Sequence, residues 1–218
     1  MKIKAVVFDL DGTLVNSIDG LAFAMNKVLK SNRFPVRNME TYKSLIGTGV
    51  RELVRKAIPA GTGEEELDRY VKEMREEYLK SWDYKMTVYE GIEELLGYLQ
   101  AQGISFAVDT NKVDDVARLI IERFFPDFRF SCVMGSKPGL PHKPDPARAN
   151  LIAGQLGMLP EQCIYLGDSE VDIMTAKNAG MISVSAAWGF RKVEDLVSAH
   201  AVNIIQEPRK LVDLLQKF

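Results

Sequence analysis

The fold of this chain is decided by the stretch Ala5-Val6-Val7-Phe8-Asp9-Leu10-Asp11-Gly12-Thr13-Leu14. Residues 5–8 are apolar, which predicts a buried strand of a parallel sheet that is covered on both faces. Asp9 then lies at the carboxyl end of this strand, where open α/β sheets place their ligands. Asp9 and Asp11 repel each other beside apolar surface, so a cation, a shared proton or hydrogen bonds must offset the cost. An ordinary strand followed by an Asp-Gly turn is the alternative that this stretch alone leaves open.

Length and composition describe an ordinary globular protein. The 218 residues suffice for one domain with a sizeable insertion, and 46% are hydrophobic against 27% charged. A net charge of −2 argues against general attraction to nucleic acid or a membrane surface. No run is long and apolar enough to span a bilayer, and Asp9 interrupts the apolar run near the N-terminus. We expect a cytoplasmic protein without nucleic-acid or membrane partners, either a monomer or a homodimer.

The chain does not return to the sheet directly after the first strand. Between residues 17 and 84 no segment has the pattern of a buried strand, whereas apolar residues at helical spacing follow Ser17, a candidate N-cap. Three further helices are predicted over residues 39–45, 50–58 and 67–79. We therefore predict a helical cap domain, residues 16–84, inserted into a core domain that comprises residues 1–15 and 85–218.

From residue 91 onward, helical and strand patterns alternate. Strands are predicted over residues 104–108, 130–134, 163–166, 182–186 and 202–205. Helices are predicted over residues 91–102, 113–125, 146–156, 171–179 and 208–216. This alternation predicts an α/β core with a doubly wound, Rossmann-like parallel sheet. Cys132 and Cys163 fall within the strand patterns and are expected to be buried free thiols.

Polar residues follow three of the later strands. Thr110 and Asn111 stand where the next helix is expected to begin, so that their backbone N–H groups can face an anion; a simple N-cap is the alternative. Lys143 lies in a proline-restrained loop, His142-Lys143-Pro144-Asp145-Pro146, and its ammonium suits a phosphate that meets a carboxylate. An exposed loop lysine is the alternative reading, and Lys137 competes for the same role.

The fourth core strand is followed by Gly167-Asp168-Ser169-Glu170-Val171-Asp172. Asp168 lies at the strand end, and Asp172 lies in the first turn of the next helix, where the helix dipole favours a carboxylate. Ser169 and Asp172 also have the spacing of a capping box, which gives Asp172 a structural explanation. Because the carboxyl ends of parallel strands meet at one edge, we expect these acids to join Asp9 in one crevice. Such an oxygen-rich site suits Mg²⁺.

Four motifs of the chain resemble those of the haloacid dehalogenase superfamily, in the same order: Asp9-Leu10-Asp11-Gly12-Thr13, Thr110-Asn111, Lys143-Pro144-Asp145-Pro146 and Gly167-Asp168-Ser169-Glu170-Val171-Asp172. The resemblance covers essentially the whole chain, and the helical insertion is similar to the cap of that superfamily. The loop at residues 45–53 resembles the cap loop of phosphoglycolate phosphatases. The sequence departs from the pattern at Asn16, where many relatives carry Asp, at Glu90, where they often carry Pro, and at Asp109, an extra acid.

The resemblance implies phosphoryl transfer through an aspartyl-phosphate, with Asp9 as the nucleophile. It also implies an Mg²⁺ ion held by Asp9, by the backbone carbonyl of Asp11 and by Asp168, with Asp172 in support. Asp11, which we expect other acids to crowd, is then a candidate for a raised pKa and for the general acid and base. A dehalogenase does not need this acid, so Asp11 favours a phosphate ester over a haloacid.

The remaining implied contacts are to the substrate. Lys143 reduces the repulsion between Asp9 and the phosphate and stabilises charge in the transition state. Thr110, the N–H of Asn111 and Gly12 bind phosphate oxygens. In the cap, Gly47 lets the loop approach the substrate and Arg51 is expected to grip a substrate carboxylate, a surface arginine being the alternative.

Three functions are compatible with these motifs. The first is an Mg²⁺-dependent phosphatase of a small organic phosphate monoester, with phosphoglycolate as one such substrate. The second is a sugar phosphomutase of the β-phosphoglucomutase type, which uses the same core but returns the phosphoryl group to its substrate. The third is a non-catalytic phosphate-binding module, against which the presence of both Asp9 and Asp11 counts.

Overall fold

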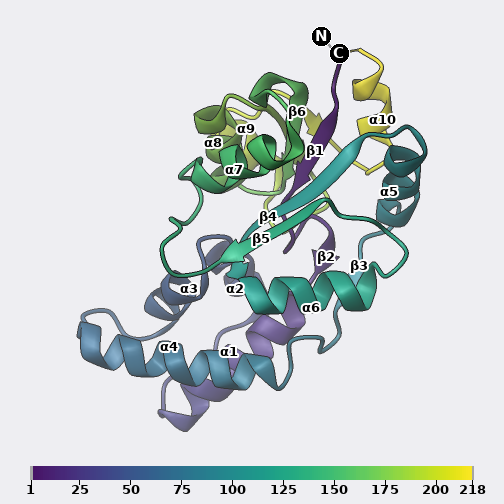
Figure 1. Ribbon diagram of the computed structural model, residues 1–218. Coiled ribbons are helices and arrows are strands. Elements are labelled where there is room, and N and C mark those ends of the chain that lie inside the picture. The colour runs from purple at the N-terminus through teal and green to yellow at the C-terminus, as the bar shows by residue number, and fades with distance from the viewer. Residues whose placement is uncertain (1, 218) are drawn as a thin grey trace.

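A computed structural model of the protein describes residues 2–217 (Figure 1). Its centre is a six-stranded sheet with the order β5-β4-β1-β6-β7-β8, in which every pair of neighbours is parallel. The strands are β1 (Ala5–Phe8), β4 (Ser105–Val113), β5 (Cys132–Ser136), β6 (Cys163–Gly167), β7 (Ile182–Ala186) and β8 (Ile204–Ile205). The predicted doubly wound parallel sheet is confirmed.

Helices cover both faces of the sheet, as the uninterrupted apolar sequence of β1 predicts. Val6 and Phe8 pack into a core shared with α5 (Ile92–Ala101), α6 (Asp114–Phe124) and α10 (Lys210–Leu215). Ala5 and Val7 point to the other face and pack with α7 (Ala147–Leu156) and α8 (Glu170–Ala179). A 3₁₀ helix, η1 (Pro160–Gln162), precedes β6, and a short α9 (Val193–Ser198) that the sequence patterns did not predict follows β7. Full burial of β1 places Asp9 at the end of the central strand.

The second core strand is longer than predicted. β4 includes Thr110 and Asn111, and its pairing with β5 shifts register between Asp109 and Val113. Helix α6 therefore begins at Asp114, and the prediction that Thr110 and Asn111 stand at a helix N-terminus is wrong. Pairing with β5 and buried partners for the polar side chains outweigh the N-cap preference of Thr110 and Asn111. β5 likewise begins two residues after its predicted start at Phe130, at Cys132.

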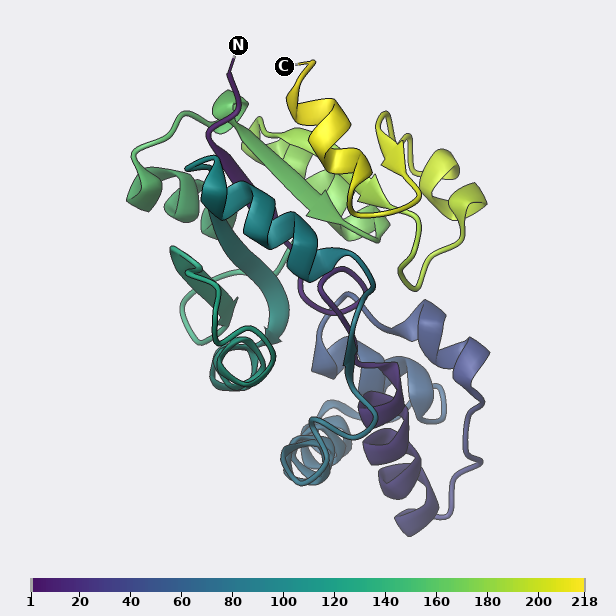
Figure 2. The ribbon, with the colours of Figure 1, turned by 90° about the vertical axis from the view of Figure 1, so that its right-hand side faces the viewer.

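The helical insertion lies beyond the carboxyl ends of the strands (Figure 1, Figure 2). It contains α1 (Ile18–Ser31), α2 (Met39–Leu45), α3 (Val50–Ala57) and α4 (Glu64–Leu79). A small antiparallel pair, β2 (Val15–Asn16) and β3 (Thr87–Val88), joins it to the core. This arrangement sets the insertion opposite the strand ends that carry the predicted site.

Two further sequence expectations concern the thiols and the membrane. Cys132 and Cys163 are free thiols, as expected, although Cys132 is only partly buried. Within the described residues, no helix combines the length and the apolar character that a membrane crossing requires.

Candidate active site

Three carboxylates converge at the carboxyl edge of the sheet. Asp9 follows β1, Asp168 follows β6, and Asp172 lies in the first turn of α8. One oxygen from each lies within 4.8 Å of the other two, and all three residues are buried. The structure thus brings Asp9 together with two acids that lie far from it in the sequence.

Lys143 is the cation at this cluster. Its Nζ lies 2.9 Å from Oδ1 of Asp9 and donates to Oδ1 of Asp172 at 2.7 Å. Nζ also donates to the backbone carbonyl of Asp109 at 3.2 Å, and the side chain is 1% exposed. Lys137, the competing lysine, lines the adjoining cavity instead. The loop between β5 and α7 therefore delivers Lys143 to the end of β1.

The cluster holds more negative than positive charge. Burial raises the pKa of Asp9 to about 7, although Lys143 opposes this rise. Burial, followed by the charges of Asp172 and Asp9, raises the pKa of Asp168 well above its ordinary value. Burial lowers the pKa of Lys143, but Asp172 and Asp9 outweigh this effect and raise it. One ammonium does not offset three buried carboxylates, so a divalent cation would relieve the cluster.

The donor set fits Mg²⁺. All three acids offer carboxylate oxygens, the ligands that this ion prefers. Oδ1 of Asp9 is buried and has the ion pair with Lys143 but no well-aligned hydrogen bond among residues 2–217. Asp9, Asp168 and Asp172 are thus the side chains that would hold such an ion.

Two glycines make room for Asp168. Gly12 has a φ of +86°, and a Cβ built on it would lie 2.4 Å from Oδ2 of Asp168. A Cβ on Gly189 would lie 2.3 Å from Cβ of Asp168 and 2.4 Å from the carbonyl of Gly12. The neighbouring N–H of Phe190 donates to Oδ2 of Asp168 at 2.7 Å. The sequence motifs pointed to Gly12 but not to Gly189 or Phe190, which lie in the loop after β7.

Asp172 forms the capping box that the sequence suggested and also contacts Lys143 at the acid cluster. Its Oδ2 accepts hydrogen bonds from the backbone N–H of Ser169 at 3.0 Å and from Oγ of Ser169 at 2.6 Å, which completes the capping box. Its Oδ1 faces Lys143. The capping box therefore fixes the carboxylate that contacts Lys143.

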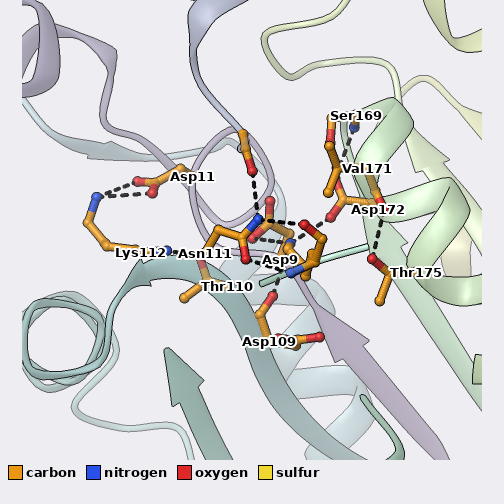
Figure 3. Close-up of polar contacts among 12 residues, drawn as sticks. Asp9, Asp11, Asp109, Thr110, Asn111, Lys112, Ser169, Val171, Asp172 and Thr175 are labelled. Carbon is orange, nitrogen blue, oxygen red and sulfur yellow. Dashed lines mark hydrogen bonds and ion pairs between the residues drawn. The ribbon is translucent and has the colours of Figure 1, made fainter. Parts of the chain in front are cut away.

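Asp11 is surrounded by donors rather than by other acids. Nζ of Lys112 donates to Oδ1 at 2.9 Å and to Oδ2 at 3.0 Å, and Oγ of Ser17 also donates to Oδ1. Nζ of Lys112 in turn lies 4.7 Å from the ring centroid of Tyr78 on α4. The expectation that acids crowd Asp11 is wrong, because β4 extends far enough to bring Lys112 to it. Figure 3 shows the carboxylate of Asp11 turned towards Lys112 and away from Asp9.

Thr110 and Asn111 lie beside this cluster as strand residues. Oγ1 of Thr110 is almost fully buried and accepts the N–H of Lys112 at 3.2 Å. Nδ2 of Asn111 donates to the carbonyl of Gly47 at 3.1 Å, across the boundary between core and insertion. Asn111 therefore connects the strand end to the Gly-rich loop of the insertion.

A cavity of about 560 Å³ lies between the insertion and the core and is lined by residues of both. Its walls include the predicted residues Asp9, Asp11, Gly47, Thr110 and Asn111. The lining also includes apolar side chains of the insertion and several basic groups, among them Leu21, Leu53, Met74, Arg75, Lys137 and His142. A substrate phosphate at Asp9 would thus extend into a space of mixed apolar and basic character.

Arg51 is not brought into this cavity. Its guanidinium pairs with Glu64 at 2.6 Å and with Asp68, both on the neighbouring helix α4. The acidic start of α4 holds Arg51 on the outside of the insertion. Arg75, on the cavity side of the same helix, is the arginine that the insertion presents to the site, and the sequence patterns did not single it out.

The chain is similar to known proteins of one family. Residues 6–186 match the model of the family described as haloacid dehalogenase-like hydrolase. The chain belongs to this family. The phosphoglycolate phosphatase of Rhodospirillum rubrum is 33% identical over 219 residues, covering 97% of this chain and 90% of the relative. The phosphoglycolate phosphatase of Pseudomonas savastanoi is 31% identical over 215 residues, covering 96% of this chain and 78% of the relative.

Solved structures confirm the fold of this haloacid dehalogenase-like hydrolase. A Lactobacillus delbrueckii subsp. bulgaricus protein, provisionally named a phosphoglycolate phosphatase, has a TM-score of 0.93 and 28% identity, covering 99% of each chain. The sequence-based assignment to a family of hydrolases, as a phosphatase that resembles phosphoglycolate phosphatases, is therefore confirmed.

Proposed function

We propose that the protein is an Mg²⁺-dependent phosphatase that hydrolyses a small organic phosphate monoester through a phosphoryl group carried on Asp9. The observation that carries this proposal is the contact of Asp9 with Lys143 beside two further buried carboxylates. A bound Mg²⁺ would supply positive charge to the phosphate oxygens. Residues 16–84 would act as the cap domain, and residues 1–15 with 85–218 as the core domain.

Asp9 performs the first chemical step in this proposal. A carboxylate oxygen of Asp9 forms a bond to phosphorus while the bond to the ester oxygen breaks. Lys143 reduces the repulsion between Asp9 and the phosphate and stabilises the charge on the transferring group. Because Lys143 is held by Asp9 and Asp172, its ammonium needs little rearrangement when the phosphate arrives.

Asp11 is the general acid and general base in this proposal. It gives a proton to the leaving alkoxide, and it takes one back from the water that displaces the phosphoryl group from Asp9 as inorganic phosphate. Asp11 lines the same cavity as Asp9, and its carboxylate must leave Lys112 to reach the leaving group. Thr110, Asn111 and Gly12 border the phosphate position.

Phosphoglycolate is the substrate that the named relatives suggest. Its carboxylate needs a cationic partner away from Asp9, and Arg75 lines the cavity from the cap side. Arg75 also contributes, after burial and Arg148, to lowering the pKa of His142, so its positive charge is felt inside the cavity. We propose Arg75, in place of Arg51, as the cap residue that binds the substrate carboxylate. The cytoplasmic location and the monomeric or homodimeric state stay predictions from the sequence.

The test is a turnover assay on a panel of phosphorylated metabolites with Mg²⁺, read both as inorganic phosphate release and as isomerised product. We expect phosphate release, with phosphoglycolate among the best substrates, and no release by Asp9→Asn. Isomerisation of a sugar phosphate without net phosphate release would establish the phosphomutase instead. If no ester were turned over, the non-catalytic phosphate-binding module would be the remaining candidate function.

A further inference from the structure

Asp109, the extra acid of the second motif, forms a fully buried ion pair. Its Oδ1 lies 2.9 Å from Nε of Arg148 on α7, and neither side chain is exposed to solvent. The hydroxyl of Tyr165 on β6 donates to Oδ2 of Asp109 at 3.1 Å and lies 3.2 Å from its backbone carbonyl. Asp109 is thus fixed from two elements, and no sequence pattern had pointed to Arg148.

Arg148 extends from this pair to the active-site loops. Its Nη2 donates to Oδ1 of Asn111 at 2.7 Å, and the same oxygen accepts the backbone N–H of Lys143 at 2.8 Å. Arginine is only a donor, so it requires the oxygen of the Asn111 amide on its side. Nδ2 of Asn111 consequently faces the carbonyls of Lys143, at 3.2 Å, and of Gly47, at 3.1 Å.

We propose that Asp109 and Arg148 are a positioning pair for the phosphoryl-transfer reaction. The pair orients the amide of Asn111, and that amide binds both the N–H and the carbonyl of Lys143. The side chain of Lys143 then reaches Asp9, and the same amide holds the cap loop at Gly47. This inference rests on the proposed function, since Lys143 is assigned there to the transferring phosphoryl group.

The geometry favours positioning over stabilisation of the fold. Within residues 2–217, Nη1 of Arg148 has no hydrogen-bond partner, and the contact between Nε and Asp109 is not aligned as a hydrogen bond. An imperfectly bonded buried ion pair adds little to stability, and apolar replacement of both partners is often neutral or stabilising. The double replacement removes both charged partners together, and the Tyr165 hydroxyl still bonds the backbone carbonyl of residue 109.

The experiment compares the wild type with Asp109→Val/Arg148→Leu and with Arg148→Met, using p-nitrophenyl phosphate and Mg²⁺. We expect kcat of both variants to fall at least about tenfold while KM changes by less than about threefold. The Tm of the double variant should fall by no more than about 4 °C. Its crystal structure should show Nζ of Lys143 moved out of hydrogen-bond distance of Asp9. A matched control, Glu207→Val/Arg209→Leu, removes an exposed ion pair that does not line the cavity and should change neither kinetic constant.

Retention of the wild-type kcat within about twofold in both variants would overturn the proposal, as would an unmoved Lys143 in the crystal structure. A double variant that cannot fold would make the pair a structural element and overturn it too. Absence of turnover by the wild type would instead refute the proposed function, and the position of Lys143 would still decide whether the pair positions it.

Discussion

Nζ of Lys143 lies 2.9 Å from Oδ1 of Asp9, and both side chains are buried at the end of the central strand. This pair is not isolated, because Asp168 and Asp172 stand within 4.8 Å of Asp9. When its acids are ionised, the site has more negative than positive charge, so it would repel an anionic phosphate unless a further cation binds there. That imbalance makes the stability of the metal-free protein depend on pH.

In the absence of divalent cations, the contribution of Asp9 to stability should decrease as the pH rises from about 4 to about 7. Its pKa is raised from 3.8 to about 7 in the folded protein, so the folded state binds a proton that the unfolded state releases. Stability linked to this proton is therefore present at low pH and lost as pH rises through about 7. Thermal unfolding in EDTA at several pH values, for the wild type and Asp9→Asn, isolates the effect. A wild type that gains stability over this window relative to the variant would contradict the charge assignment.

Asp168→Asn should weaken the response to Mg²⁺ more than it disturbs the fold. The amide keeps an oxygen for the N–H of Phe190 but removes one carboxylate from the cluster. We expect the Mg²⁺ concentration for half-maximal activity to rise at least about tenfold. The increase in Tm on adding Mg²⁺ should shrink as well. Asp145→Asn serves as the matched control, because within residues 2–217 the Asp145 side chain accepts a hydrogen bond only from the backbone N–H of Ala147. An unchanged Mg²⁺ requirement would remove Asp168 from the metal site.

Gly189→Ala should damage the site through the backbone. The added Cβ would lie 2.4 Å from the carbonyl of Gly12 and 2.3 Å from Cβ of Asp168, so the loop must move. We expect a lower Tm together with a loss of activity. Gly97→Ala is the matched control, because its Cβ meets nothing within 4 Å on helix α5 and should stabilise the helix by about 0.5–1 kcal/mol. Equal behaviour of the two variants would show that the loop at Gly189 adapts freely.

Arg75→Ala should lower kcat/KM for phosphoglycolate at least about tenfold, which corresponds to a lost charged contact of about 1.5 kcal/mol. For p-nitrophenyl phosphate, which lacks the carboxylate, the loss should be much smaller. Arg51→Ala provides the control, since Arg51 pairs with Glu64 and Asp68 away from the cavity. A selective loss in Arg51→Ala, with none in Arg75→Ala, would reverse the assignment.

The parts of the site that the sequence predicted are those set by strand ends. Asp9 and Asp168 follow short apolar runs, and the topology of a parallel sheet is sufficient to bring them together. Lys143 and Asp172 were predicted from a proline-restrained loop and a helix start, which are also local signals.

The other features of the site depend on contacts between residues far apart in the sequence, which local sequence patterns do not indicate. Continued pairing with β5 extends β4, and this brings Lys112 to Asp11. The orientation of α4 about its axis places Arg75 at the cavity. The acidic residues at the start of α4 pair with Arg51 and keep it away from the cavity. Arg148 lies on α7 and meets Asp109 only when that helix packs on the sheet. Periodicity and spacing carry no information about such pairs.

The most direct test of the central claim is to find the covalent phosphoryl group. Wild-type protein is mixed with Mg²⁺ and the best substrate of the panel, quenched in acid within the first turnover, and digested for peptide mass spectrometry. We expect a phosphorylated peptide with the group on Asp9, and none in Asp9→Asn. Phosphate release at an undiminished rate by Asp9→Asn, or a phosphoryl group on a different residue, would contradict it.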